Sequence, residues 1–386
     1  MEAVQSPIIP VVGQLIRDNP GTISLGQGVV FYPPPPQARD ALSEFFANPQ
    51  NHQYQLVQGI PQLLEIIQLK LSTENGIIVT EKNAIVVTSG GNMAFMNAIL
   101  AITSAGDEII LNTPYYFNHE MAIRMADCQP VLVETDSNYQ LRTPAIAAAI
   151  TAKTRAVVTI SPNNPTGAVY SESDLRTINQ ICRERGIYHI SDEAYEYFTY
   201  DSSKHFSTGS IPDSENYTIS LYSLSKAYGF ASWRIGYMVI PQHLLSAVKK
   251  IQDTILICPP VISQYAAWGS LKAGVNYCKN HLLEIAKIRN KIQEELQVIA
   301  DIVTIPKAEG AFYFFVKVNA DIDDFELVKI LIEKYRVAVL PGTTFGMTDG
   351  CYLRIACGAS DYTTTTEGIK RLVKGLRVTV NEKAQH

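Results

Sequence analysis

The chain has 386 residues, of which 46% are hydrophobic and 18% charged, and its formal net charge is −5. A chain of this length buries about three quarters of its extended surface on folding, which excludes disordered and fibrous classes. The charges are spread without long runs of one sign, so no nucleic-acid or anionic-membrane partner is indicated. Chemistry on small molecules is the class that remains.

The cysteines and the N-terminal segment indicate the compartment. The six cysteines form no C-x-x-C pair, so neither disulfides nor a zinc site is predicted. Residues 1–16 carry an acid and no base, unlike a secretory signal, and apolar stretches such as 94–102 are too short to span a membrane. We expect a cytoplasmic protein with buried thiols.

Short apolar runs alternate with helix-length stretches over the first 240 residues. This alternation predicts an α/β fold with a mostly parallel, seven-stranded sheet flanked by helices. Strands are expected at 84–88, 108–112, 131–134, 156–160, 187–191, 218–222 and 235–240, with helices including 92–103, 145–152 and 173–184. Ligands of such sheets bind at the carboxyl ends of strands, so the loops there are where chemistry is expected.

From about residue 276 the pattern changes to a smaller α+β domain. We expect a long helix at 277–299, a strand at 310–318, a helix at 324–335, two short strands and a closing helix. The first 45 residues, with the proline run 33–36, are too irregular to form a domain alone. The predicted division is an arm and small-domain segment at 1–45, a large domain at 46–276, a small domain at 277–378 and a tail at 379–386.

Two loops after predicted strands present groups suited to a small polar ligand. Gly90 and Gly91 open an apolar helix, where free N–H groups and close backbone approach favour a phosphate. A tight strand-to-helix turn would explain the same residues. The loop 161–167 contains Asn-Asn-Pro-Thr-Gly, whose prolines fix a rigid turn that presents the Asn164 amide.

Two further loops add ionisable groups. Asp192 follows a buried strand, where a carboxylate needs a cationic partner, although a helix N-cap is the alternative. Lys226 follows another apolar strand in Ser-Leu-Ser-Lys, with Arg234 eight residues later. Desolvation lowers the pKa of a lysine amine towards its nucleophilic form, whereas a surface lysine would stay solvated. A pyridoxal phosphate site is therefore predicted, because one edge of the sheet combines a phosphate cradle, an amide, a carboxylate and an imine-forming lysine.

Six motifs stand in the order found in one enzyme family. The chain resembles the fold type I pyridoxal-phosphate-dependent aminotransferases, the class I/II aminotransferase family, over nearly its whole length. The motifs are Ser-Gly-Gly-Asn at 89–92, Pro-Tyr-Tyr at 114–116, Asn-Asn-Pro-Thr-Gly at 163–167, Ser-Asp-Glu-Ala-Tyr at 191–195, Ser-Leu-Ser-Lys at 223–226 and Trp-Arg-Ile-Gly at 233–236.

The resemblance implies a role for each cofactor-binding residue. Lys226 would hold the cofactor as an imine and later move the substrate's Cα proton, and Asp192 would pair with the pyridine nitrogen. Tyr195, which is a core aromatic in the alternative interpretation, would bond the ring oxygen O3′ together with Asn164. Tyr116 would stack on the ring, unless Tyr115 takes that place. The implied phosphate ligands are Gly90, Gly91, Asn92, Ser223, Ser225 and Arg234, with Tyr54 reaching the neighbouring site of a homodimer.

For substrate, the resemblance implies that Arg354 grips the α-carboxylate, aided by Asn164 and the Gly28 N–H. Relatives dedicated to dicarboxylic substrates often carry a further cation, whereas residues 251–270 contain no base and Asn92 follows the Gly-Gly pair. We therefore expect a neutral, apolar or aromatic amino donor and a 2-oxo acid acceptor. Tyr32 and Tyr313 are candidates to shape that pocket, or else core aromatics.

Other outcomes on the same site remain open. A β-eliminating C–S lyase, a cyclising synthase or an aspartate aminotransferase would use the same cofactor residues. A cofactor-sensing DNA-binding regulator is disfavoured, because no basic segment precedes the enzyme-like region. Because Lys226, Asp192 and Arg354 are all present, an inactive structural homologue is also disfavoured.

Overall fold

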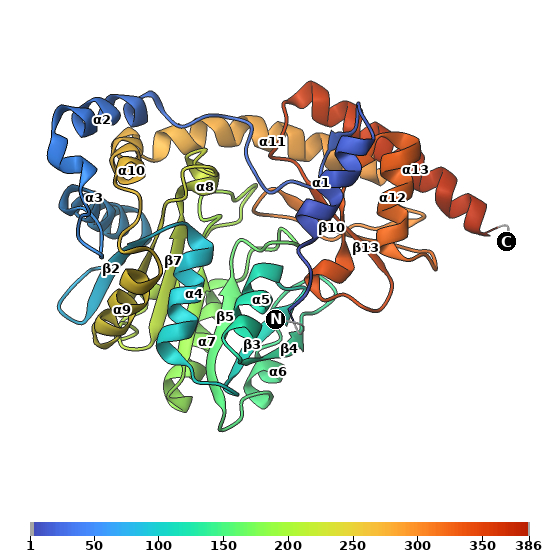
Figure 1. Ribbon diagram of the computed structural model, residues 1–386. Helices are drawn as coiled ribbons and strands as arrows, with labels where there is room; N and C mark the ends of the chain where they lie inside the picture. Colours follow the sequence, from blue (N-terminus) through green and yellow to red (C-terminus); the bar gives the residue numbers. More distant parts are fainter. Residues whose placement is uncertain (1–3, 385–386) are drawn as a thin grey trace.

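The computed structural model describes residues 4–384, which form a large sheet beside a smaller α+β unit (Figure 1). The large sheet has seven strands in the order β2-β8-β7-β6-β5-β3-β4, and β8 alone among them runs antiparallel to its neighbours. Its strands are β2 (Asn83–Thr88), β3 (Glu108–Thr113), β4 (Gln129–Glu134), β5 (Thr154–Ile160), β6 (Tyr188–Asp192), β7 (Thr218–Ser223) and β8 (Gly236–Pro241). The predicted fold class is confirmed.

Helices cover both faces of this sheet, so its central strands are buried on both sides. Every residue of β2 and of β8 is buried, as the unbroken apolar runs of a doubly covered sheet require. The surrounding helices are α3 (Pro61–Lys70), α4 (Gly91–Ile102), α5 (Phe117–Met125), α6 (Thr143–Ala148), α7 (Glu172–Arg185), α9 (Leu245–Leu256) and α10 (Val261–Ala273). The helix predicted at 145–152 ends earlier, because the Thr154 hydroxyl accepts from the Thr151 N–H and fixes the turn into β5.

The smaller unit combines an antiparallel sheet with three helices. Its sheet has the order β12-β13-β10-β9. The elements are α11 (Val275–Gln297), β9 (Val303–Thr304), β10 (Tyr313–Val318), α12 (Asp324–Tyr335), β11 (Val337–Ala338), β12 (Leu340–Pro341), β13 (Cys351–Ala356) and α13 (Tyr362–Ala384). Helix α13 continues through residues 379–384, where the sequence predicts a tail, and residues 385 and 386 lie outside the described part.

Residues 4–47 are more ordered than their prolines suggest. They contain α1 (Ile8–Asp18), β1 (Ile23–Ser24) and α2 (Pro36–Ala47). Pro10 lies in the first turn of α1 and Pro36 at the first position of α2, where a missing N–H breaks no helical bond. Strand β1 pairs in parallel with β11, which attaches the N-terminal segment to the small unit as expected.

Two further observations concern the cysteines and the helices. All six cysteines are buried and unpaired, which confirms the expected buried thiols. Among residues 4–384, no helix combines the length and the apolar character needed to cross a membrane.

Candidate active site

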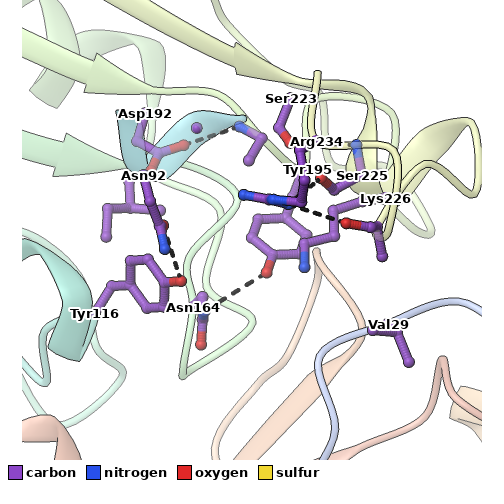
Figure 2. Close-up of a pocket in the computed structure, with 14 residues that line it drawn as sticks. Val29, Asn92, Tyr116, Asn164, Asp192, Tyr195, Ser223, Ser225, Lys226 and Arg234 are labelled. Atoms are coloured by element: carbon purple, nitrogen blue, oxygen red, sulfur yellow. Dashed lines mark hydrogen bonds between the residues drawn. The ribbon is translucent and has the colours of Figure 1, made fainter. Parts of the chain in front are cut away.

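Loops from the carboxyl ends of the central strands enclose a cavity of about 230 Å³ (Figure 2). It is lined by residues from β5, β6 and β7 and from the loops that follow them, and by the start of α4. The predicted residues that line it are Gly91, Asn92, Tyr116, Asn164, Asp192, Tyr195, Ser223, Ser225, Lys226 and Arg234. The structure therefore gathers nearly all of the predicted cofactor residues around one space.

One end of the cavity is built to receive an anion. Helix α4 begins at Gly91, and a Cβ at Gly90 would lie 2.3 Å from the Arg234 Nη2 atom, so only glycine leaves room for the guanidinium. Both Gly90 (φ 86°) and Arg234 (φ 57°) have left-handed backbone, which is costly for arginine and clusters at functional sites. Free helix N–H groups beside a guanidinium form a phosphate-binding arrangement.

Lys226 lies in α8 (Leu224–Ala227), a single helical turn that follows β7 directly. Ser223 caps this turn by accepting from the Ser225 N–H, and the Lys226 amine donates to the Gly28 carbonyl. Burial lowers the pKa of Lys226 to about 8, aided by the charges of Arg354 and Arg234 and opposed by Asp192. The alternative interpretation of Lys226 as a solvated surface lysine is therefore wrong.

Asp192 is the last residue of β6, and both of its oxygens have partners. One oxygen lies 3.1 Å from His119 Nε2, and the other accepts from the Ala194 N–H at 3.1 Å. No helix begins after it, so the N-cap alternative is wrong. His119 is 2% exposed and stacks on Phe95 with ring centroids 3.8 Å apart.

The sequence interpretation missed His119. It stands three residues after Tyr116 in α5, which places both side chains on the face of that helix nearest the cavity. The need of Asp192 for a partner was a signal that, combined with this spacing, would have found it.

Arg354 projects from β13 of the small unit towards the large one. Its guanidinium donates to the Asn164 side-chain oxygen at 2.8 Å and to the Gly26 carbonyl at 2.7 Å. Arg354 is 2% exposed, makes no ion pair in the described part of the chain, and leaves its buried Nε without a partner there. A buried arginine with spare donors is suited to a carboxylate ligand.

Tyrosines form the remaining wall. The Tyr195 hydroxyl lies 2.8 Å from that of Tyr313 and accepts from the Asn164 amide at 3.5 Å. Tyr116 lines the cavity with its hydroxyl 3.2 Å from Asn92 Oδ1, whereas the Tyr115 ring packs against Gly346, so the alternative with Tyr115 in the site is wrong.

A second cavity of about 370 Å³ adjoins the first and contains the substrate-binding residues predicted above. The residues that line both cavities are Val29, Tyr116, Asn164, Tyr195 and Lys226. The second is also lined by Pro7, Ile9, Gln27, Gly28, Phe117, Asn118, Tyr313 and Arg354. Tyr54, by contrast, is 76% exposed and lines neither cavity of its own chain, and Tyr32 also lies outside both.

Comparison with known proteins decides the family. The family described as "Aminotransferase class I and II" matches residues 20–376. The chain belongs to the class I and II aminotransferases. This aminotransferase is 31% identical to an aromatic aminotransferase, ISS1, of Arabidopsis thaliana over 96% of this chain and 93% of that one. It is 36% identical to a probable aspartate/prephenate aminotransferase of Aquifex aeolicus over 82% of each.

A solved structure agrees with this assignment. The aromatic aminotransferase from Pyrococcus horikoshii matches this aminotransferase with a TM-score of 0.88 and 29% identity, covering 95% of this chain and 99% of that one. Enzymes of this family depend on pyridoxal phosphate and exchange an amino group between an amino acid and a 2-oxo acid. The residues present fit the cofactor, because the cradle of Gly90 and Arg234, the buried Lys226 amine and the Asp192 carboxylate surround one cavity.

Proposed function

We propose that this aminotransferase prefers a neutral, apolar or aromatic L-amino acid as donor and passes the amino group to a 2-oxo acid in two alternating half-reactions. The observation that carries the proposal is the charge of the second cavity. Its cations are Lys226 and Arg354, and the remaining lining residues bear no positive charge.

The side-chain end of that cavity is apolar and amide-lined. Pro7, Ile9, Val29 and Phe117 contribute hydrocarbon surface, and Asn118 contributes a neutral amide. With Arg354 engaged by the α-carboxylate, a second carboxylate on the substrate would stay unpaired, at a cost of several kcal/mol. A side chain without charge fits this surface better.

Pyridoxal phosphate, when bound, supplies an aldehyde for covalent attachment and a ring that withdraws electrons from the substrate's Cα. We assign the attachment to Lys226, whose released amine then takes the Cα proton. Asp192, which contacts His119, would hold a proton on the ring nitrogen. Tyr195 and Asn164 would bond the ring oxygen, and Tyr116 would cover the ring face.

The phosphate is assigned to the anion cradle. Gly91 and Asn92 at the start of α4 would donate backbone N–H groups, and Ser223, Ser225 and Arg234 would donate from side chains. Gly90 would contribute through close backbone approach, because its own N–H already donates to the Thr88 carbonyl at 2.8 Å. We further propose a homodimer in which Tyr54 reaches the partner's phosphate. We also retain the division into a large domain at 46–276 and a small one at 277–378.

The assignment of Lys226 is tested by the spectrum of the purified protein. We expect a visible absorbance band that disappears in Lys226→Ala, and borohydride should fix the cofactor's mass on the peptide containing residue 226. Lys250→Ala, which removes an exposed lysine on α9, is the control and should keep both signals. Cofactor mass on another lysine would reject the assignment.

The donor preference is tested by steady-state kinetics with phenylalanine, leucine, kynurenine and aspartate, each with 2-oxoglutarate. We expect kcat/KM to be higher for the first three, by roughly tenfold or more for phenylalanine over aspartate. A strong preference for aspartate would reject the proposal.

Two alternatives would show themselves in the same assays. An aspartate aminotransferase is the second candidate, because relatives at similar identity carry that name, including one from Pyrococcus abyssi at 30% identity. A C–S lyase would release pyruvate and ammonia from cystathionine without any 2-oxo acid.

A further inference from the structure

Residues 28–33, here called the strap, connect the β1 region to α2 and lie against the helical turn that carries Lys226. The Lys226 amine donates to the Gly28 carbonyl at one end of the strap. At the other end, a Cβ on Gly229 would lie 2.5 Å from the Tyr32 carbonyl, so the two backbones are in direct contact there. Val29 of the strap and Lys226 both line the first cavity (Figure 2).

Tyr32 adds a side-chain bond between these contacts. Its hydroxyl lies 3.2 Å from the Ala227 carbonyl and 3.3 Å from the Lys226 carbonyl. The last carbonyls of any helix lack partners within the helix. The Tyr32 hydroxyl therefore caps the end of α8, while Ser223 caps its start.

The ring of Tyr32 is itself fixed by α11. It is 5% exposed and stacks on His281 with ring centroids 3.9 Å apart and an interplanar angle of 8°. Tyr277 meets it edge-on, and the Tyr277 hydroxyl donates to the Pro33 carbonyl. A chain of contacts thus runs from α11 through Tyr32 to the backbone of Lys226.

We propose that Tyr32 is a positioning residue for Lys226: its hydroxyl holds the carbonyls of α8 and so sets where the Lys226 amine lies in the cavity. The inference rests on the proposed attachment of the cofactor to Lys226. Because Tyr32 lines neither cavity, it acts on the reaction through Lys226 and not through the substrate.

The test compares two variants that each remove one buried hydroxyl. Tyr32→Phe removes the hydroxyl that caps α8. Tyr228→Phe is the matched control, because the Tyr228 hydroxyl is buried in the same aromatic cluster and has no hydrogen-bond partner in residues 4–384. The thermal midpoint of each apoprotein checks that it folds.

The first readout is the reactivity of the Lys226 amine itself. The apoprotein is methylated with formaldehyde and cyanoborohydride across a range of pH, and modification at residue 226 is measured by mass spectrometry. The charged groups that act on this amine are Asp192, Arg234 and Arg354. The pH at which its modification is half-maximal therefore depends on the position of the amine among these groups. In Tyr32→Phe we expect the midpoint to move by roughly half a pH unit or more, and in Tyr228→Phe to stay at the native value.

The second readout is a split between kinetic constants in the loaded enzyme. We expect Tyr32→Phe to lower kcat about three- to tenfold with KM for the amino acid unchanged, since one hydrogen bond is lost away from the substrate. His281→Ala, which keeps the hydroxyl but removes the stacked ring, should move both readouts in the same direction.

Two failures are distinguishable. If borohydride fixes the cofactor on Lys226 but Tyr32→Phe and His281→Ala behave like Tyr228→Phe, the positioning role is rejected and the proposed function stands. If the cofactor is fixed on another lysine, the assignment of Lys226 fails first.

Discussion

Gly90 and the Arg234 guanidinium are in close contact at the end of the site to which we assign the phosphate. Glycine is favoured at position 90 by its φ of 86°, and a Cβ there would lie 2.3 Å from the guanidinium. A substitution would therefore displace the charged group to which we assign the phosphate.

We expect Gly90→Ala to weaken cofactor binding by about 10- to 100-fold, because one charge-assisted contact is lost. Equilibrium dialysis of the apoprotein against pyridoxal phosphate measures this. Gly106→Ala is the control, since Gly106 has a similar φ of 82° but nothing within 4 Å of the added Cβ. Equal affinities for the two variants would contradict the prediction.

The buried amine of Lys226 also links stability to pH. Its pKa falls from an ordinary 10.5 to about 8 on folding, so between these values the folded chain binds fewer protons than the unfolded one. The lysine therefore contributes stability that is complete above pH 10.5 and is lost as pH falls to about 8.

In the apoprotein, Lys226→Met should consequently be more stable than the native chain at neutral pH, with the advantage shrinking as pH rises towards 10.5. Urea unfolding at several pH values measures the difference. Lys250→Met, on the exposed face of α9, is the control for replacing a lysine by methionine where the amine is solvated. A difference that grows with pH would contradict the argument.

Among the elements, α9 packs on the sheet through Val248 and is hydrogen-bonded to it through the buried side chain of Gln252. The Gln252 amide donates to the carbonyls of Val57 and Val87, and its oxygen accepts from the Asn97 amide at 3.1 Å. Gln252 thereby joins α9, α4 and β2 to the segment that carries Tyr54.

We expect Gln252→Leu to lower the free energy of unfolding by roughly 2–4 kcal/mol, because it leaves these buried polar groups unpaired. Denaturant titration followed by circular dichroism measures this loss. Gln293→Leu, exposed on α11, should change stability little. A loss of the same size in both variants would show that the bonds of Gln252 are not its cause.

The sequence predicts elements of this fold better than their contacts. The strands were recognisable because central strands are unbroken apolar runs, and the predicted bounds of β7 differ from the observed ones by one residue. The reversed direction of β8 was not predicted, although the link after β7 holds only a one-turn helix and lacks the longer helix that usually makes a parallel crossover.

For the site, too, the positions of residues on the sheet were predicted better than their long-range contacts. Lys226, Asp192 and Asn164 were predicted because each follows a strand of one sheet, and parallel strands bring their carboxyl ends together. His119 and the pairing of Tyr195 with Tyr313 were not, because those contacts join residues 73 and 118 positions apart in the chain, a separation that carries no periodic signal.

At the scale of the whole molecule, exposed apolar residues lie on two segments that the Gln252–Val57 hydrogen bond joins, the loop that carries Tyr54 and the end of α9. Tyr54 is 76% exposed and Leu56 60%, and Ile255 and Ile257 at the end of α9 are 48% and 38% exposed. Large apolar side chains left in water favour association with a second chain. This surface supports the proposed homodimer.

Complementation tests whether Tyr54 acts across that dimer. We expect Tyr54→Ala and Lys226→Ala homodimers each to be impaired, and a mixture of the two, refolded together, to regain activity. In a mixed dimer the Tyr54→Ala chain keeps its own Lys226 and receives Tyr54 from its neighbour. Light scattering verifies the dimer, and a mixture no more active than the Tyr54→Ala enzyme alone would contradict the prediction.

The parallel pairing of β1 with β11 joins Ile23 to Val337, and Arg354 donates to the Gly26 carbonyl. These contacts link residues 23–26 to residues that are synthesised much later. The seven strands of the large sheet all end by Pro241, so they emerge well before β11 and β13 exist. A chain that stops short of residue 354 would therefore carry Lys226 but lack the guanidinium to which we assign the α-carboxylate, and we expect no turnover from it.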